Sequence, residues 1–203
     1  MRVLIIILTM VIVSGTAYSG DFYLSAGPEY FLPMNDYKKS NAACFGLKAE
    51  LLARATCKFW YGLRVDRLYM KEKDGNPVYT EEIVNKIPVR TPFYFDDVFY
   101  VSPVVKWNPF VKNCYNDKLV PYIQGLLHFG FIDENRAKMS RDNIGMEVGA
   151  GVGAGIAYTF TWMQRCWMLD LDGVYSMPNI IIQDDAHASL KSLNFGLTIG
   201  VAL

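Results

Sequence analysis

The final stretch of the chain, residues 192–203, alternates strictly between large apolar side chains and small or polar ones. The large apolar set is Leu193, Phe195, Leu197, Ile199, Val201 and Leu203, and the other set is Ser192, Asn194, Gly196, Thr198, Gly200 and Ala202. Because successive side chains of a β-strand point to opposite faces, the pattern predicts a strand with one wide apolar face and one narrow polar face. A membrane barrel accounts for both faces, since it has lipid outside and a tight polar lumen inside.

The start of the chain has the form of a secretory signal peptide. Arg2 precedes an apolar run over residues 3–13, and small and polar residues follow it. The run is shorter than the ~20 residues that a membrane-spanning helix needs, so an uncleaved anchor is the weaker interpretation. Ala17-Tyr18-Ser19 fits a cleavage site. We therefore expect a signal peptide over residues 1–19 and one mature domain over residues 20–203.

The charge balance argues against a nucleic-acid-binding protein. The whole chain carries 20 Lys plus Arg and 20 Asp plus Glu. Cleavage of the signal would remove one base, Arg2, and no acid, which leaves a net charge of about −1. A protein that binds a phosphate backbone usually shows a basic excess. Tyr and Phe are plentiful, as expected for β-strands and for the aromatic belts of membrane proteins.

Clusters of turn-forming residues divide the mature chain into eight candidate strands. They cover roughly residues 21–32, 43–54, 58–70, 95–107, 119–132, 145–160, 165–177 and 190–203. Their spacing predicts an all-β fold, an eight-stranded antiparallel up-and-down transmembrane barrel. Pro103 and Pro121 each remove a backbone donor, so we expect a bulge or a strand end at both.

The second face of these strands collects charged side chains of both signs beside many glycines. An eight-stranded barrel has an interior just wide enough for side chains to fill, and opposite charges there can pair. A soluble ligand-carrying barrel would show the reverse arrangement. The predicted lumen charge network consists of Glu29, Lys48, Glu50, Arg64, Asp66, Lys106, Glu147, Asp170 and Asp172.

The connections alternate between short and long. The links after strands two, four and six are the shorter ones, as on the periplasmic side of outer-membrane barrels, and the longer links would face outward. All four tryptophans lie beside the short links, which predicts an aromatic girdle at that membrane interface. Its members are Trp60, Trp107, Trp162 and Trp167, although the alternation places Trp60 on the lumen face.

Export would place the four cysteines, Cys44, Cys57, Cys114 and Cys166, in an oxidising compartment. Four cysteines allow three pairings, and the sequence does not choose among them. We favour a disulfide between Cys114 and Cys166, because the long middle turn gives reach, and free thiols are the competing interpretation.

Three segments carry a resemblance to a known family: residues 121–125 (PYIQG), the glycine ladder Gly149–Gly155, and residues 169–175 (LDLDGVY). With the alternating strands, they make the chain similar to the small outer-membrane β-barrel family, which includes the transmembrane domain of outer membrane protein A. The resemblance covers nearly the whole mature chain. Many members end in an aromatic residue that the assembly machinery reads, whereas this chain ends in Leu203.

The resulting functional prediction is an integral outer-membrane protein with a structural or surface-interaction role such as envelope integrity, adhesion or antigenic display. We expect no catalysis, cofactor or metal, and a monomer. The expected partners are outer-membrane lipid, the barrel-assembly machinery and a surface ligand of the long loops, with no nucleic acid. Two alternatives stay open: a narrow channel for small solutes, and a soluble periplasmic or secreted ligand-binding barrel.

Overall fold

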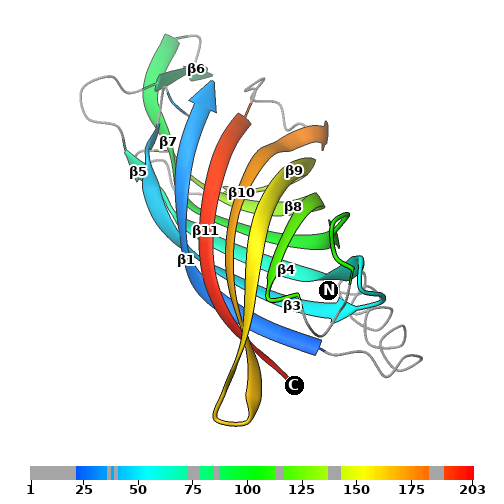
Figure 1. Cartoon of the computed structure of the whole chain (residues 1–203). Helices are drawn as coiled ribbons and strands as arrows, with labels where there is room; N and C mark the ends of the chain where they lie inside the picture. Colours follow the sequence, from blue (N-terminus) through cyan, green and yellow to red (C-terminus); the bar gives the residue numbers. More distant parts are fainter. Residues whose placement is uncertain are drawn as a thin grey trace.

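A closed antiparallel sheet makes up most of the computed structural model (Figure 1). The structure describes residues 22–35, 38, 41–72, 78–84, 87–112, 117–136, 143–182 and 190–203, with the side chains of 71–97, 132–147 and 178–190 excepted. The predicted signal peptide over residues 1–19 lies outside the described residues. Within the described ranges, no helix is both long enough and apolar enough to cross a membrane.

Eight long strands form the barrel. They are β1 (Phe22–Asn35), β3 (Cys44–Arg54), β4 (Phe59–Tyr69), β7 (Ile87–Trp107), β8 (Leu119–Arg136), β9 (Asn143–Trp162), β10 (Arg165–Ile182) and β11 (Leu190–Ala202). Consecutive barrel strands pair antiparallel, β1 also pairs with β11, and together these pairings close the ring. The predicted eight-stranded antiparallel barrel is thus confirmed, with strand centres where the sequence pattern placed them.

Three short strands add to this frame. The strands β2 (Asn41–Ala42) and β5 (Lys71–Glu72) pair with each other, and β6 (Val78–Val84) pairs with the first part of β7. Much of the predicted long loop over residues 71–94 is therefore strand. The expectation for Pro103 and Pro121 was wrong, because the β4–β7 and β8–β9 registers run through them without a shift.

The connections separate into two ends of the barrel. The links between β3 and β4, β7 and β8, and β9 and β10 lie at one end, which we call the short-turn end; the opposite end is the long-loop end. Met163 and Gln164 form the tightest link and have φ angles of 50° and 60°. Positive φ at both central residues is what a two-residue hairpin turn with the right twist requires.

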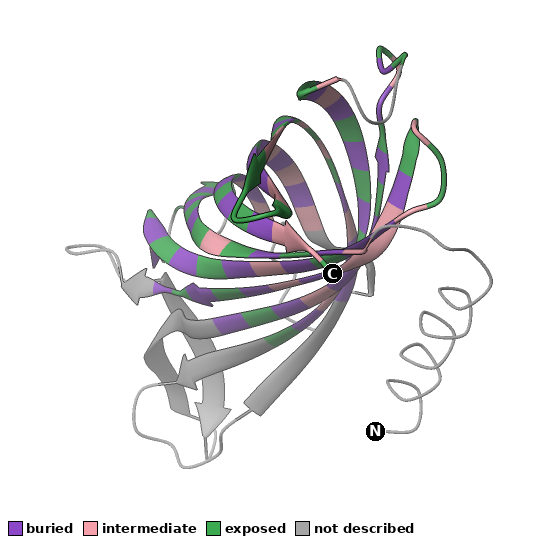
Figure 2. Ribbon diagram, turned by 60° about the horizontal axis from the view of Figure 1, so that its bottom comes forward, coloured by how far each residue is buried: buried purple, intermediate pink, exposed green. Residues whose placement is uncertain are grey.

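Burial alternates along the strands, as Figure 2 shows by its purple and green bands. In β4, for example, Arg64, Asp66 and Leu68 are buried, while Arg67 and Tyr69 are exposed. In the described strands the inward face is therefore the one with charges and small residues, and the outward face is the apolar one. This arrangement is inside-out relative to a soluble barrel.

Candidate functional site: a buried charge network

The centre of the barrel interior is organised around one guanidinium group. Arg64 on β4 donates from Nε to both carboxylate oxygens of Asp66, at 2.7 and 2.9 Å. Its Nη1 donates to Asp172 Oδ2 at 3.1 Å, and its Nη2 donates to Glu29 Oε1. All four side chains are at least 97% buried, and the planar guanidinium supplies the fixed fork of donors that three separate carboxylates require.

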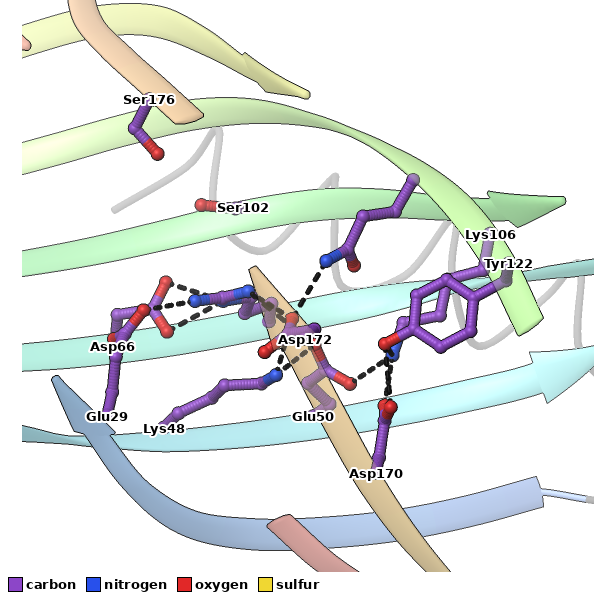
Figure 3. A network of polar contacts seen from close by, with 12 residues as sticks. Glu29, Lys48, Glu50, Asp66, Ser102, Lys106, Tyr122, Asp170, Asp172 and Ser176 are labelled. Carbon is purple, nitrogen blue, oxygen red and sulfur yellow. Dashed lines mark hydrogen bonds and ion pairs between the residues drawn. The ribbon is translucent and has the colours of Figure 1, made fainter. Parts of the chain in front are cut away.

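Two lysines extend the network along the barrel axis. Lys48 Nζ lies 2.8 Å from Asp172 Oδ2 and 3.3 Å from Glu50 Oε1. Lys106 Nζ lies 2.8 Å from Glu50 Oε2 and 2.6 Å from Asp170 Oδ2 (Figure 3). Glu50 therefore links the two ammonium groups, so the ion pairs form one continuous cluster rather than separate pairs.

Neutral side chains complete the coordination of this cluster. The hydroxyl of Tyr122 donates to Asp170 Oδ1 at 2.7 Å, and the amide nitrogen of Gln124 donates to Asp172 Oδ2 at 2.8 Å. The Tyr122 hydroxyl also accepts from Lys106 Nζ at 3.3 Å. The sequence analysis missed the role of Tyr122, although its parity on β8 places it on the same face as Gln124.

The members come from four neighbouring strands, β1, β3, β4 and β7, and from β10 on the opposite side of the ring. Glu29 lies on β1, Lys48 and Glu50 on β3, Arg64 and Asp66 on β4, Lys106 on β7, and Asp170 and Asp172 on β10. The strands β4 and β10 share no backbone hydrogen bonds, yet their side chains meet in the middle (Figure 3). The contacts that Arg64, Lys48 and Lys106 make to Asp172 and Asp170 are therefore cross-links through the interior, independent of the backbone ladder.

Carboxyl groups outnumber cations in the described interior. The cluster holds five carboxyls, those of Glu29, Glu50, Asp66, Asp170 and Asp172, against the three cations Lys48, Arg64 and Lys106. Consistent with this excess, Glu29 Oε2 and Asp172 Oδ1 are buried and have no hydrogen-bond partner in the described part of the chain. Each cation is consequently shared by several acids.

Apolar layers lie on either side of the charged layer. Toward the short-turn end, a cluster of buried residues includes Tyr23, Leu52, Trp60, Val120 and Met168. Toward the long-loop end, a second cluster consists of Phe31, Cys44, Leu68, Met70, Val98 and Tyr100. Side chains of both clusters point inward, so an apolar layer covers the charged layer on each side.

The structure brings together eight of the nine residues predicted for the lumen network. The ninth, Glu147, has a side chain outside the described residues. His128, which shares this inward face, lies apart from the charges and hydrogen-bonds to Ser102 and Ser176 at 2.9 and 3.1 Å. This arrangement is a set of shared ion pairs shielded from solvent. It offers no exposed nucleophile and base in contact.

The prediction for Trp60 is corrected by the structure. Trp60 is only 5% exposed, and its ring stacks inside the barrel on Tyr23 at a centroid distance of 5.1 Å. The reason is strand parity, because residue 60 shares the inward face of β4 with Arg64. Trp107 and Trp162 are exposed on the outside, and Trp167, partly exposed, packs against Trp162 with ring centroids 5.4 Å apart.

The favoured disulfide is also corrected. Cys166 has a free thiol, which excludes its pairing with Cys114, and Cys114 itself lies outside the described residues. Cys57 is disulfide-bonded, and Cys44 is free. Cys166 points to the interior, where its Sγ lies 3.8 Å from the Tyr23 hydroxyl. Spacing along the sequence could not reveal that orientation.

A cavity of about 250 Å³ opens at the short-turn end, above the Tyr23–Trp60 stack. We call it the vestibule, and its walls include Tyr23, Cys57, Trp60, Val111, Val120 and Cys166. A smaller void of about 10 Å³ lies deeper, beside Trp60, Lys106 and Asp170. That volume is close to the space that one water molecule needs.

Comparisons with known proteins match the fold. Neisserial surface protein A superposes with a TM-score of 0.58 at 14% identity, over 90% of this chain and 97% of that one. Ail, the attachment invasion locus protein of Yersinia pestis, gives 0.54 at 12% identity, over 92% and 100%. The outer membrane protein OprG from Pseudomonas aeruginosa gives 0.52 at 11% identity, over 91% and 94%.

The chain has the fold of the small eight-stranded outer-membrane barrels. No protein-family model matches its sequence, and no curated protein matches it either. The likeness to these proteins is therefore one of backbone shape, since the sequence identities are only 11–14%.

Proposed function

We propose that this protein is an integral outer-membrane barrel that does not conduct and that presents its long-loop end to the cell surface. The single observation that carries the proposal is the reversal of polarity between the two faces of the sheet. A charged, cross-linked interior lies behind an outward face of large apolar side chains. Such a face is stable in lipid and unstable in water.

The outward face has the properties of a lipid-contacting band. Phe45, Leu47, Leu171, Phe195 and Ile199 are all at least 46% exposed. Along the described outward positions, charged side chains are confined to the ends, with Arg67 and Lys191 toward the long-loop end and Arg165 at the short-turn end. A tryptophan-rich rim at the short-turn end fits a membrane interface.

Strand length supports a wall that extends beyond the membrane. The strands β7 to β10 contain 21, 18, 20 and 18 residues. Roughly 9–11 residues suffice for a tilted strand to cross the bilayer. Because the tryptophan rim fixes the short-turn end at one interface, the surplus projects at the other. This projecting wall is the part of the molecule available for adhesion, envelope contacts or antigenic display.

Cell-fractionation and heat modifiability test the membrane barrel. A closed barrel has its strand donors paired and no free edge, so it resists detergent until it is heated. We expect the protein in the membrane fraction, with a gel mobility in detergent that changes on boiling. Recovery in the soluble fraction with no change in mobility would contradict the proposal and favour the soluble ligand-binding barrel.

A narrow channel is the competing function within the membrane. The layered interior supports a plug, since ion pairs and two apolar clusters occupy the axis. Reconstitution in planar bilayers measures directly whether the barrel conducts ions. The plug predicts no conductance above that of lipid alone. Stable unitary currents from the unmodified protein would contradict the plug and show that the barrel is a channel.

A further inference from the structure

The vestibule contains a free thiol and an unused hydrogen-bond donor. Cys166 lines the cavity, is partly exposed and has no disulfide partner. Trp60, only 5% exposed, lines the same cavity, and its indole Nε1 has no acceptor among the described residues. A buried indole N–H usually has a partner, so this donor is an unsatisfied group in the wall of the cavity.

The surroundings of Cys166 favour reaction with a small molecule. The cavity of about 250 Å³ gives a reagent space to approach the sulfur, and the Tyr23 hydroxyl lies 3.8 Å from Sγ, within reach to donate to a developing thiolate. The walls beyond the thiol combine apolar groups, Val111, Val120 and the Tyr23–Trp60 stack, with three polar side chains, those of Arg54, Asp117 and Thr159.

The other free thiol, that of Cys44, has a contrasting environment. Cys44 is 7% exposed in the apolar cluster toward the long-loop end, and its thiol contacts Met70 Sδ at 3.8 Å. It does not line the vestibule. The chain therefore contains a matched pair of free thiols, one facing a cavity and one packed in a core.

We propose that Cys166 is a covalent site for low-molecular-mass disulfides, with the vestibule holding the attached group. The Cys166 thiolate attacks one sulfur of a small disulfide R–S–S–R. The Cys166–S–R bond forms as the original S–S bond breaks, and the leaving thiolate takes up the proton that Cys166 lost. The Cys166 sulfur is oxidised and the departing sulfur is reduced, so no other oxidant is needed.

The place of this site in the cell rests on the proposed function. An exported barrel meets an oxidising compartment, where small disulfides persist. The short-turn end would then face the periplasm, so the vestibule would record the redox state of that compartment. The chemistry at Cys166 itself depends only on the cavity and the thiol.

Mass spectrometry of the folded full-length protein tests the proposal, with cystamine as the probe. Wild type and Cys44→Ser should each gain one adduct, mapped to Cys166, whereas Cys166→Ser should gain none. Cys166 should react at least tenfold faster than Cys44 in the folded barrel, and the two rates should converge after denaturation. Ala202→Leu, which narrows the vestibule, should slow the reaction at Cys166 without altering the heat-dependent mobility shift.

Three outcomes would overturn the site: no reaction at Cys166 in the folded barrel, equal rates at Cys44 and Cys166, or recovery of Cys166 bonded to Cys57. The last would show that the thiol exchanges with the protein's own disulfide. The mobility shift of the same samples reports separately on the proposed membrane barrel, so failure of the thiol chemistry is distinguishable from failure of the proposed function.

Discussion

Arg64 on β4 and Asp172 on β10 lie on opposite sides of the sheet's ring, and Arg64 Nη1 donates to Asp172 Oδ2 at 3.1 Å. The two strands have no backbone hydrogen bonds in common. This side-chain contact therefore spans the interior at the level where the charges gather. It also joins two strands that the backbone ladder connects only through the strands between them.

Arg64 should be the most sensitive position in the interior. Arg64→Met leaves Glu29, Asp66 and Asp172 without their shared cation, and breaking a buried ion pair in this way costs about 3–5 kcal/mol. Urea-induced unfolding in lipid vesicles, followed by tryptophan fluorescence, measures the loss in unfolding free energy.

Two variants serve as controls for Arg64. Arg67→Met removes an exposed outward-facing guanidinium, so its effect should be small. Glu29→Gln removes one of the surplus carboxyls and should be milder than Arg64→Met. Equal effects of all three substitutions would contradict the view that the cations are the limiting partners.

The inward glycines set the space available to the polar side chains. A Cβ on Gly151 would lie 2.6 Å from His128 Nε2 and 3.3 Å from Ser176 Oγ, whereas a Cβ on Gly125 would meet nothing within 4 Å. Gly151→Ala should lower the unfolding free energy by about 1–3 kcal/mol through overpacking, and Gly125→Ala should be neutral. Thermal or urea unfolding of both variants checks the contrast; a neutral Gly151→Ala would mean that His128 moves aside easily.

The outward face should penalise charge only where lipid covers it. Leu171, midway along the outer side of β10 and 58% exposed, is an expected lipid contact. Leu171→Arg should destabilise the barrel in vesicles and lower its unfolding free energy by about 2–4 kcal/mol. Met163→Arg, in the exposed turn, should have little effect. If Leu171→Arg left the unfolding free energy in vesicles unchanged, the outward face would not be in contact with lipid.

The tryptophans should differ in their contact with lipid. Single-tryptophan variants, with the other three replaced by Phe, can be reconstituted into vesicles that contain brominated lipid. Fluorescence from Trp107 or Trp162 should be quenched, because both rings are exposed on the outside. Fluorescence from Trp60 should survive, because its ring is stacked on Tyr23 in the interior. Strong quenching of Trp60 would contradict its inward orientation.

Sequence reasoning located the barrel because alternation has a single geometric cause. Side chains two residues apart share a face, so the last strand and the glycine ladder could be assigned to inside and outside without tertiary information. The same parity rule argued against Trp60 as a girdle residue, but its position beside a turn was given more weight. In the structure, odd or even position along the strand decides whether a side chain faces the interior or the outside. Nearness to a turn decides only how close the side chain lies to the end of the barrel.

Other features depend on contacts that no local pattern contains. The turn-rich run over residues 71–77 (KEKDGNP) predicts a loop, yet strand β6 follows it directly and pairs with β7. Pro103 and Pro121 were expected to interrupt their strands, yet the register is continuous through both. Which cysteines are free depends on which of them the closed ring brings together: Cys44 lies toward the long-loop end, away from Cys57 and Cys166 beside the vestibule.

The pairing of β1 with β11 has a consequence for how the molecule is made. Residues 22–35 find one of their two neighbours only in residues 190–202, the strand that the ribosome adds after the other seven strands of the ring. The interior network is likewise incomplete until β10 has been made, because Arg64 on β4 donates to Asp172 on β10. Contacts of such long sequence separation form slowly. The ring therefore gains its full stability only after its last strand has been made, when the two edges of the sheet meet.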